Sequence, residues 1–324
     1  MKAFSYKLVG STDEATSAGT QSAFIAGGTN LVDLMKIDVM DPKELVDINQ
    51  LPMRGVTLDS GGLRIGALEK MAYVAEQPDV VQHFPVISQA LLKSASAQLR
   101  NMASIGGNLM QRTRCGYFRD VVMPCNKRDP GSGCPAFAGE NRMHAILGVG
   151  NACCATHPSD LAVALVALDA SIKLQGPNGT RSIKLDDFYL LPGDTPDREH
   201  DIQSGELITE VSVPHADWYQ RSAYLKIRDR ESYEFALCSA AIALDLDGQT
   251  IRDARVAAGG VGTKPWRLPE VAQALIGKQA GEDTFKHAAE LASNGARPLG
   301  QNAFKVILLK RTLTRGLIQV GGAA

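Results

Sequence analysis

The chain has 324 residues, of which 44% are hydrophobic and 21% are charged. At roughly 150 residues per domain, this length favours two domains over a single core. The 34 Lys and Arg residues and the 35 Asp and Glu residues leave a net charge of -1, so no basic surplus exists to neutralise a nucleic-acid backbone. The most apolar stretch, 161–170, is ten residues long, which argues against membrane insertion because a spanning helix needs roughly 20.

Short strands alternate with helices over residues 1–60, and further strands and helices follow up to about residue 215. The stretch 1–19 contains no apolar core of a secretory signal, so we expect any export to depend on a partner. Apolar spacing and turn residues predict strands over 23–26, 44–48, 56–58, 63–65, 170–175, 181–185 and 206–213. The same criteria predict a helix that begins at the capping box Ser11–Glu14, and helices over 30–36, within 70–101 and over 160–168.

From about residue 218 the pattern changes. Strand-like runs at 222–228, 235–246 and 250–258 precede helical patterns at 268–276, 283–293 and 300–319. Strands followed by helices indicate an α+β domain with helices on one face of an antiparallel sheet. We therefore predict one domain over 1–217 and a smaller α+β domain over 218–324.

Two Gly-Gly segments stand out, AGGTN at 26–30 and SIGGN at 104–108. Paired glycines let a backbone turn tightly and approach a ligand, and the N–H groups that follow can hold a diphosphate. Each segment taken alone is more often a plain turn, and neither matches the dinucleotide or P-loop fingerprint. A third run, GGVGTK at 259–264, imitates a phosphate loop. Pro265 follows it and no helix begins there, so we interpret this run as structural.

Five of the six cysteines fall within 40 residues, at positions 115, 125, 134, 153 and 154. The absence of C-x-x-C pairs argues against zinc, whereas a cubane iron–sulfur cluster tolerates wide spacing if four thiolates converge. Adjacent Cys153 and Cys154 point to opposite sides of an extended backbone, so only one should be a ligand. A loop of incidental thiols is the alternative interpretation.

Cationic side chains surround the cysteines and would offset thiolate charge and raise a reduction potential. They are Arg112, Arg114, Arg119, Lys127 and Arg128. Cys238 lies in an apolar strand pattern and is interpreted as a core thiol. The six histidines form no H-E-x-x-H and no G-x-S-x-G is present, so a hydrolase would lack its nucleophile and base.

Six segments are distinctive together: AGGTNL (26–31), ASIGGNL (103–109), THPSDLAVALVALDA (156–170), ELITEVSVP (206–214), YLKIRDRESYEFA (224–236) and GGVGTKPWR (259–267). In this order and spacing they resemble the flavin-binding medium subunit of the xanthine oxidase group of molybdenum hydroxylases. The resemblance extends over essentially the whole chain. It is closest to the flavin subunits of bacterial aldehyde oxidoreductases of the three-subunit, periplasmic type.

The resemblance implies a vanillyl-alcohol-oxidase-like FAD-binding domain, of the p-cresol methylhydroxylase type, followed by a smaller α+β domain. It implies that both Gly-Gly loops hold the FAD diphosphate, that Asp160 contacts the adenosine end or holds the loop, and that Lys226 and Ile208 approach the flavin ring. The implied cofactor-binding residues are Ala26, Gly27, Gly28, Thr29, Asn30, Leu31, Ser104, Gly106, Gly107, Asn108, Asp160, Ile208 and Lys226. Thr29 stands where relatives with covalent flavin have His, so the FAD is expected to be non-covalent.

Residues of about 112–156 resemble an insertion that holds a [4Fe-4S] cluster in 4-hydroxybenzoyl-CoA reductase. By order, the implied ligands are Cys115, Cys125, Cys134 and Cys153, with Cys154 as the alternative fourth ligand. The cysteine spacings differ from those of the reductase, which leaves both choices for the fourth ligand open.

The resemblance also implies a role in a heterotrimer. A large subunit with the molybdenum cofactor would oxidise an aldehyde to a carboxylic acid, and a small subunit with [2Fe-2S] clusters would relay electrons. The FAD of this chain would pass them to an external electron acceptor, so no catalytic residue for substrate chemistry is expected here. A free-standing flavin oxidase and a non-catalytic iron–sulfur module are the alternatives. We expect a periplasmic location by co-export with a signal-bearing partner, or a cytoplasmic one because no signal is present.

Overall fold

The N-terminal residues form a small parallel sheet. The structure, a computed structural model, describes residues 1–322, so the last two residues of the predicted second domain lie outside it. The sheet contains β1 (Ser5–Leu8), β3 (Glu44–Asp47) and β2 (Ser22–Ile25), with the helices α1 (Thr12–Thr16) and α2 (Leu31–Lys36). Ser11 caps α1, because its hydroxyl accepts from the N–H of Glu14 at 3.2 Å. β1 was not predicted; all four of its residues are exposed, including the apolar Tyr6 and Leu8.

A five-stranded antiparallel sheet forms the body of the first domain. Its strands, in spatial order, are β4 (Val56–Asp59), β5 (Gly62–Gly66), β8 (Leu207–Pro214), β6 (Ser171–Gly176) and β7 (Gly179–Lys184). Leu63 and Ile65 on β5 and Val211 and Val213 on β8 alternate towards one face and are fully buried or nearly so. The strands predicted over 56–58 and 63–65 pair as the antiparallel hairpin β4–β5, and those predicted over 170–175 and 181–185 pair as β6–β7.

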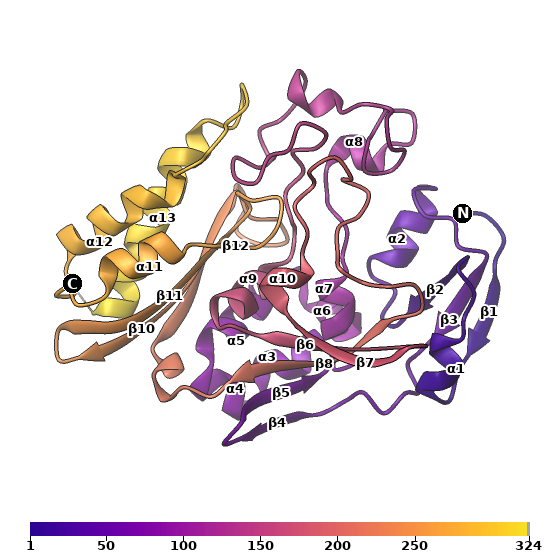
Figure 1. Cartoon of the computed structure of the whole chain (residues 1–324), viewed down its shortest axis with the longest axis horizontal. Coiled ribbons are helices and arrows are strands. Elements are labelled where there is room, and N and C mark those ends of the chain that lie inside the picture. Colours follow the sequence, from indigo (N-terminus) through magenta and orange to yellow (C-terminus); the bar gives the residue numbers. More distant parts are fainter. Residues whose placement is uncertain (323–324) are drawn as a thin grey trace.

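Helices cover the buried face of this sheet (Figure 1). The helical stretch 70–101 is divided, because Pro78 and Pro85 each begin a new helix and neither can donate an N–H to the preceding turn. The helices are α3 (Met71–Glu76), α4 (Pro78–His83), α5 (Pro85–Leu92), α6 (Ala97–Met102), α7 (Ile105–Leu109), α9 (Asp160–Ala167) and α10 (Leu185–Phe188). α9 is buried at every residue and packs against α5 and the C-terminal sheet.

The C-terminal residues form the predicted antiparallel sheet followed by helices. Its elements are η2 (Asp217–Gln220), β9 (Ser222–Ile227), β10 (Cys238–Asp247), β11 (Thr250–Gly259), β12 (Trp266–Arg267), α11 (Pro269–Leu275), α12 (Glu282–Glu290), η3 (Leu291–Ser293) and α13 (Phe304–Gly321). Along β10, Ala240 and Ile242 pack against α11–α13, whereas Ala241 and Ala243 pack against the first domain. Both faces of the sheet are therefore covered, and the hydrophobic core continues across the domain junction.

Residues 112–156 have little regular structure beyond α8 (Gly116–Arg119) and η1 (Pro135–Phe137). They lie at the top of the view in Figure 1. A small core of Leu34, Phe118 and Cys125 joins this segment to α2. We call residues 112–156 the cysteine segment.

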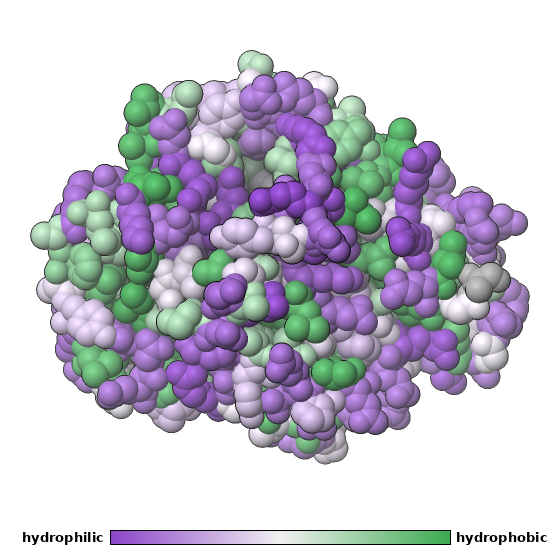
Figure 2. Space-filling view, turned by 180° about the vertical axis from the view of Figure 1, so that it is seen from behind, coloured by the Kyte–Doolittle hydropathy of each residue, from purple (hydrophilic) through white to green (hydrophobic). Residues whose placement is uncertain are grey.

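The surface mixes hydrophilic and hydrophobic side chains across the face shown in Figure 2. Over residues 1–322, no helix has both the length and the apolar character needed to cross a membrane.

Candidate functional site

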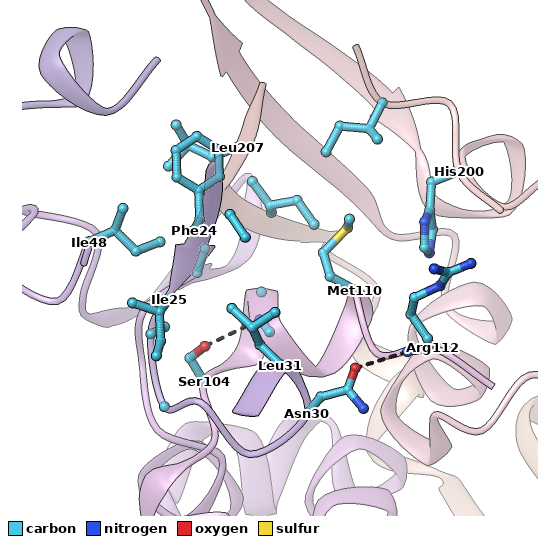
Figure 3. Close-up of a pocket in the computed structure, with 18 of the residues that line it drawn as sticks. Phe24, Ile25, Asn30, Leu31, Ile48, Ser104, Met110, Arg112, His200 and Leu207 are labelled. Carbon is cyan, nitrogen blue, oxygen red and sulfur yellow. Dashed lines mark hydrogen bonds between the residues drawn. The ribbon is translucent and has the colours of Figure 1, made fainter. Parts of the chain in front are cut away.

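A cavity of about 480 Å³ opens beside β2, α7 and β8 (Figure 3). We call it the glycine cavity, because both Gly-Gly segments line it. It brings together ten of the thirteen predicted FAD-binding residues: Ala26, Gly27, Gly28, Thr29, Asn30, Leu31, Ser104, Gly106, Gly107 and Ile208. The first Gly-Gly segment at 26–30, the start of α7 at Ile105 and the start of β8 at Leu207 thus meet although they lie far apart along the chain.

The first Gly-Gly segment offers free hydrogen-bond donors to this cavity. Within residues 1–322, the backbone N–H groups from Gly27 to Leu31 have no acceptor in the protein. The buried side-chain Nδ2 of Asn30 also lacks a partner among these residues. A row of free N–H groups at a cavity wall is an arrangement that binds anions, so this wall fits a phosphate-bearing ligand.

Glycine is required at both positions of this segment. A Cβ atom on Gly27 would overlap the carbonyl oxygen of Met102, because the chain passes directly over the end of α6. Gly28 has a φ of +69°, in the left-handed region that side chains disfavour. Larger residues would move the wall of donors or close the cavity.

The second Gly-Gly segment is a short helix and not the predicted loop. Ser104 caps α7 by accepting from the N–H of Gly107 at 3.2 Å. The N–H of Gly106 donates to the carbonyl of Ala67 at 2.8 Å, so it is not free for a ligand. A Cβ on Gly106 would lie 3.1 Å from the Cβ of Ala67. This glycine therefore allows α7 to sit close to the chain at Ala67, while the free N–H groups come from the first segment.

Sequence reasoning missed most of the opposite wall. The stretch before β8, with Glu199 and His200, and Arg112 after α7 form it. The lining residues that were not predicted are Ala23, Phe24, Ile25, Met40, Ile48, Ala67, Leu68, Met110, Arg112, Asp197, Arg198, Glu199, His200, Ile202, Glu206 and Leu207. Apart from Glu206 and Leu207, which begin the segment ELITEVSVP, none of them lies in the six distinctive segments. Arg112 had one usable signal, its place four residues after SIGGN, but it was interpreted only as a charge near the cysteines.

Three predicted residues lie outside the glycine cavity. The Oδ1 of Asn108 accepts from the hydroxyl of Ser159 at 2.6 Å. Asp160 lines a second cavity of about 630 Å³ between the two domains, which we call the junction cavity. The side chain of Lys226 is 1% exposed, and its Nζ lies 2.7 Å from a carboxylate oxygen of Asp160. The resemblance put Ile208 and Lys226 at one flavin ring, but the structure puts Ile208 in the glycine cavity and Lys226 beside the junction cavity.

The cysteine segment brings its five thiols close enough to influence one another. Burial raises the pKa of Cys115 to about 11, and the thiols of Cys153 and Cys125 contribute. A hydrogen bond with Cys154 lowers the pKa of Cys134 to about 6 and raises that of Cys154. Cys238 is buried on β10, away from these five, as predicted for a core thiol.

Hydrogen bonds to sulfur distinguish the individual cysteines. Cys115 Sγ lies 3.2 Å from Nε2 of His144, and Cys153 Sγ accepts from the N–H of Ala155 at 3.4 Å. Burial raises the pKa of Cys153, while the charge of Lys127 opposes this rise. In the described part of the chain, no group of three or more His, Cys, Asp or Glu side chains is placed to hold a metal ion.

The cationic side chains near the cysteines are largely compensated. Arg114 and Arg119 both bind Asp33, each at 2.8 Å. Arg112 and Lys127 both bind Glu199, and Arg128 donates to backbone carbonyls. The predicted surplus of positive charge is therefore mostly neutralised by acidic residues that lie far away in the sequence.

Family comparison agrees with this architecture. Residues 2–216 match the FAD binding domain in molybdopterin dehydrogenase, and residues 223–320 match the CO dehydrogenase flavoprotein C-terminal domain. The chain belongs to the family of FAD-binding medium subunits of molybdenum hydroxylases, which are oxidoreductases. The predicted family and the predicted fold are thereby confirmed.

Individual relatives cover the whole chain. The aldehyde oxidoreductase FAD-binding subunit PaoB of Escherichia coli is 47% identical over 100% of both chains. The glyceraldehyde dehydrogenase medium chain of Sulfolobus acidocaldarius is 30% identical over 91% of this chain and 89% of the relative. A solved carbon monoxide dehydrogenase from Hydrogenophaga pseudoflava superposes with a TM-score of 0.77 at 22% identity, over 99% of this chain and 98% of that one.

Proposed function

We propose that this chain is the FAD- and [4Fe-4S]-binding electron-transfer subunit of a molybdenum-dependent aldehyde oxidoreductase, which oxidises an aldehyde to a carboxylic acid. The full-length relative from Escherichia coli, at 47% identity, is named as the FAD-binding subunit of an aldehyde oxidoreductase. The row of free N–H groups from Gly27 to Leu31 carries the flavin part of the proposal.

The glycine cavity fits the phosphate-bearing part of FAD. The free N–H groups and the Nδ2 of Asn30 would hold the diphosphate, and apolar residues such as Phe24, Ile48 and Leu207 would contact a flat, apolar group. Thr29 offers no imidazole for covalent attachment, so the FAD is held non-covalently. Bound FAD supplies a ring that accepts and donates electrons.

The junction cavity is the place that we propose for the flavin ring. Cys115 lines this cavity together with Ser159, Asp160 and Phe235, so a ring there lies beside the cysteine segment. Ser159 and Asn108 are hydrogen-bonded, which connects α7 at the glycine cavity to this second cavity. The Lys226–Asp160 pair then holds the wall of the ring site and places a positive charge behind it.

The cysteine segment supplies the thiols for the proposed [4Fe-4S] cluster. A cluster spreads its ligands over a larger volume than one ion, and burial together with hydrogen bonds to sulfur sets its potential. We propose Cys115, Cys125, Cys134 and Cys153 as the ligands. Cys153 is favoured over Cys154 because its sulfur accepts a backbone N–H and lies near the charge of Lys127, both of which stabilise a thiolate.

The same purified complex tests both cofactors. In Gly27→Val the new side chain overlaps Met102, so we expect loss of flavin with the iron retained. In Cys115→Ser we expect loss of iron, with flavin still bound at saturating FAD. Flavin absorbance and iron content of each preparation measure this. Gly10→Ala, where a Cβ meets open space, and Cys238→Ser are the matched controls and should retain both.

Two results would contradict the proposal. Full flavin in Gly27→Val would refute the glycine site, and unchanged iron in Cys115→Ser would refute the cluster. Turnover by the isolated chain would instead identify a free-standing flavin oxidase.

We further propose that the chain works in a heterotrimer, with a large molybdenum-cofactor subunit and a small [2Fe-2S] subunit, and reduces an external electron acceptor. Relatives are named medium chains, which supports a subunit role. We propose a periplasmic location by co-export with a signal-bearing partner, with a cytoplasmic location as the alternative. The identity of the co-purifying chains and cell fractionation test these points.

A further inference from the structure

Glu199 lies between the glycine cavity and the cysteine segment. Its side chain lines the glycine cavity and also a small cavity of about 20 Å³ whose wall includes Lys127 and Cys153. Arg198 and His200 share both walls. The stretch 198–200 is therefore the common boundary of the two sites.

The carboxylate of Glu199 binds one cation from each side. One oxygen pairs with the guanidinium of Arg112 and the other lies 3.0 Å from Nζ of Lys127. Burial opposes ionisation of Glu199, but the charges of Lys127 and Arg112 outweigh it and hold its pKa below the usual value. Lys127 also donates to the carbonyl of Pro196 at 2.7 Å, so it attaches the cysteine segment to the cavity wall at two points.

Arg112 continues this connection to the first Gly-Gly segment. It lines the glycine cavity, and its backbone N–H donates to Oδ1 of Asn30 at 3.2 Å (Figure 3). Its guanidinium lies 4.7 Å from the ring centre of Phe118, which packs with Cys125. Glu199 thus fixes a side chain that contacts both sites.

We infer that Glu199 is a positioning residue that couples the two sites, so that an occupied cysteine site strengthens FAD binding and bound FAD strengthens cluster retention. This inference rests on the proposed function. Thiolate ligation fixes Cys125 and Cys134, and hence Lys127 between them. Fixed Lys127 orders Glu199, and ordered Glu199 holds Arg112 at the glycine cavity. Without the cluster, FAD binding must order these side chains itself, which weakens it.

Coupling between two binding sites is reciprocal and typically changes affinity by 5- to 150-fold. We expect wild-type complex to bind FAD about tenfold more tightly with its iron than after iron depletion. In Glu199→Gln, the uncharged amide no longer joins the two cations, so the ratio of the two FAD dissociation constants should fall to about one. Titration of flavin-free complex with FAD, with and without iron, measures the ratio.

Glu206 provides the matched control. It lines the same cavity, is 7% exposed and pairs with Arg181 of β7 at 2.7 Å instead of with the cysteine segment. Glu206→Gln should keep the wild-type ratio whatever its absolute affinity. If Glu199→Gln does not fold, Lys127→Met tests the same connection from the other side. Lys127 does not line the glycine cavity, and the ratio should again fall to about one.

A wild-type ratio of one, or a full wild-type ratio in Glu199→Gln or Lys127→Met, would overturn the coupling. These outcomes count against the coupling when the wild-type complex contains both flavin and iron. Wild-type complex without flavin or without iron is a different result, because it refutes the proposed function and the coupling with it.

Discussion

Asp160 carries a charge into the junction of the two domains, where it has several partners. It pairs with Nζ of Lys226 at 2.7 Å and accepts from the hydroxyls of Tyr224 at 2.7 Å and Ser94 at 3.1 Å. Both members of the ion pair are almost wholly buried. Buried charges are tolerated only when they are paired and hydrogen-bonded, so this network binds β9 to the start of α9.

Replacing Asp160 by Asn leaves the charge of Lys226 buried without a counter-charge. Breaking such a pair costs about 3–5 kcal/mol, and we expect the free energy of unfolding to fall by this amount in a urea titration. Asp217→Asn is the control, because its carboxylate is 92% exposed, and its effect should stay within about 0.5 kcal/mol. Equal stability of Asp160→Asn and wild type would show that Lys226 needs no carboxylate.

Helix α13 contributes an amine that holds the cysteine segment in place. Lys305 lies in the first turn of α13 and is wholly buried. Its Nζ donates to the carbonyls of Met143 at 3.0 Å, His144 at 3.1 Å and Gly260 at 2.7 Å. Burial lowers the pKa of Lys305 to about 8 from 10.5. The helix thus anchors the backbone of His144, whose ring meets Cys115.

The pKa of Lys305 makes stability depend on pH in the alkaline range. Between pH 8 and 10.5 the unfolded chain holds this proton more tightly than the folded chain, so the free energy of unfolding rises with pH. The rise is about 3 kcal/mol for this group. We expect the free energy of unfolding of Lys305→Met, measured by urea titration, to show no such rise between pH 8 and 10.5. Lys310 lies on the same helix, is partly exposed and pairs with Glu290, so Lys310→Met should retain the rise in stability. The prediction would be contradicted if the free energy of unfolding of Lys305→Met and wild type changed in parallel with pH.

Other elements show why helix boundaries needed the structure. The apolar spacing of 70–101 predicted helix without its interruptions, although Pro78 and Pro85 were visible in the sequence. The resemblance implied that SIGGN is a loop. The structure makes it helical, since Ser104 caps α7, and the close approach to Ala67 leaves little room for a Cβ on Gly106.

At the scale of the whole molecule, two domains share one core. Ala241 and Ala243 of β10 and Ala257 of β11 belong to the same cluster as α9 and the large sheet. Asp169 of the first domain pairs with Arg255 and Arg267 of the second. We therefore expect the chain to unfold as a unit. The boundary at 217/218 stays a prediction about the sequence, close to the gap between the two family matches.

Acid should destabilise the whole molecule through buried histidine. Burial lowers the pKa of His200 to about 4, with Glu199 opposing this and Arg112 and Lys127 reinforcing it. The unfolded chain, with a pKa near 6.5, binds this proton first, so stability falls as the pH drops from 6.5 to 4, by about 3 kcal/mol.

His200→Phe should escape this loss, because phenylalanine cannot be protonated and can stack on Phe188 as His200 does at 5.0 Å. We expect a smaller acid-induced decrease in the free energy of unfolding for His200→Phe than for wild type. His215→Asn, at the surface, should follow wild type. The same decrease in all three proteins would exclude His200 as the cause.

Much of the local structure was predictable, because it depends on neighbours along the chain. All the predicted strands formed, with ends within a few residues of those expected. Ser11 caps its helix as predicted, and the alternation of apolar and polar residues along β5 and β8 could be recognised in the sequence. The Gly-Gly segment at 27–28 was recognised, and the structure supplies the steric reason for both glycines.

The sequence by itself determined the elements, the family and the residue types available for flavin and for a cluster. Only the tertiary structure decided which of them meet. It placed Glu199 between Arg112 and Lys127, moved Asp160 and Lys226 away from the glycine cavity, and engaged the N–H of Gly106 with Ala67. The physical reason is that these contacts join residues tens of positions apart. Short-range periodicity and capping carry no information about which distant charge or carbonyl a side chain will find.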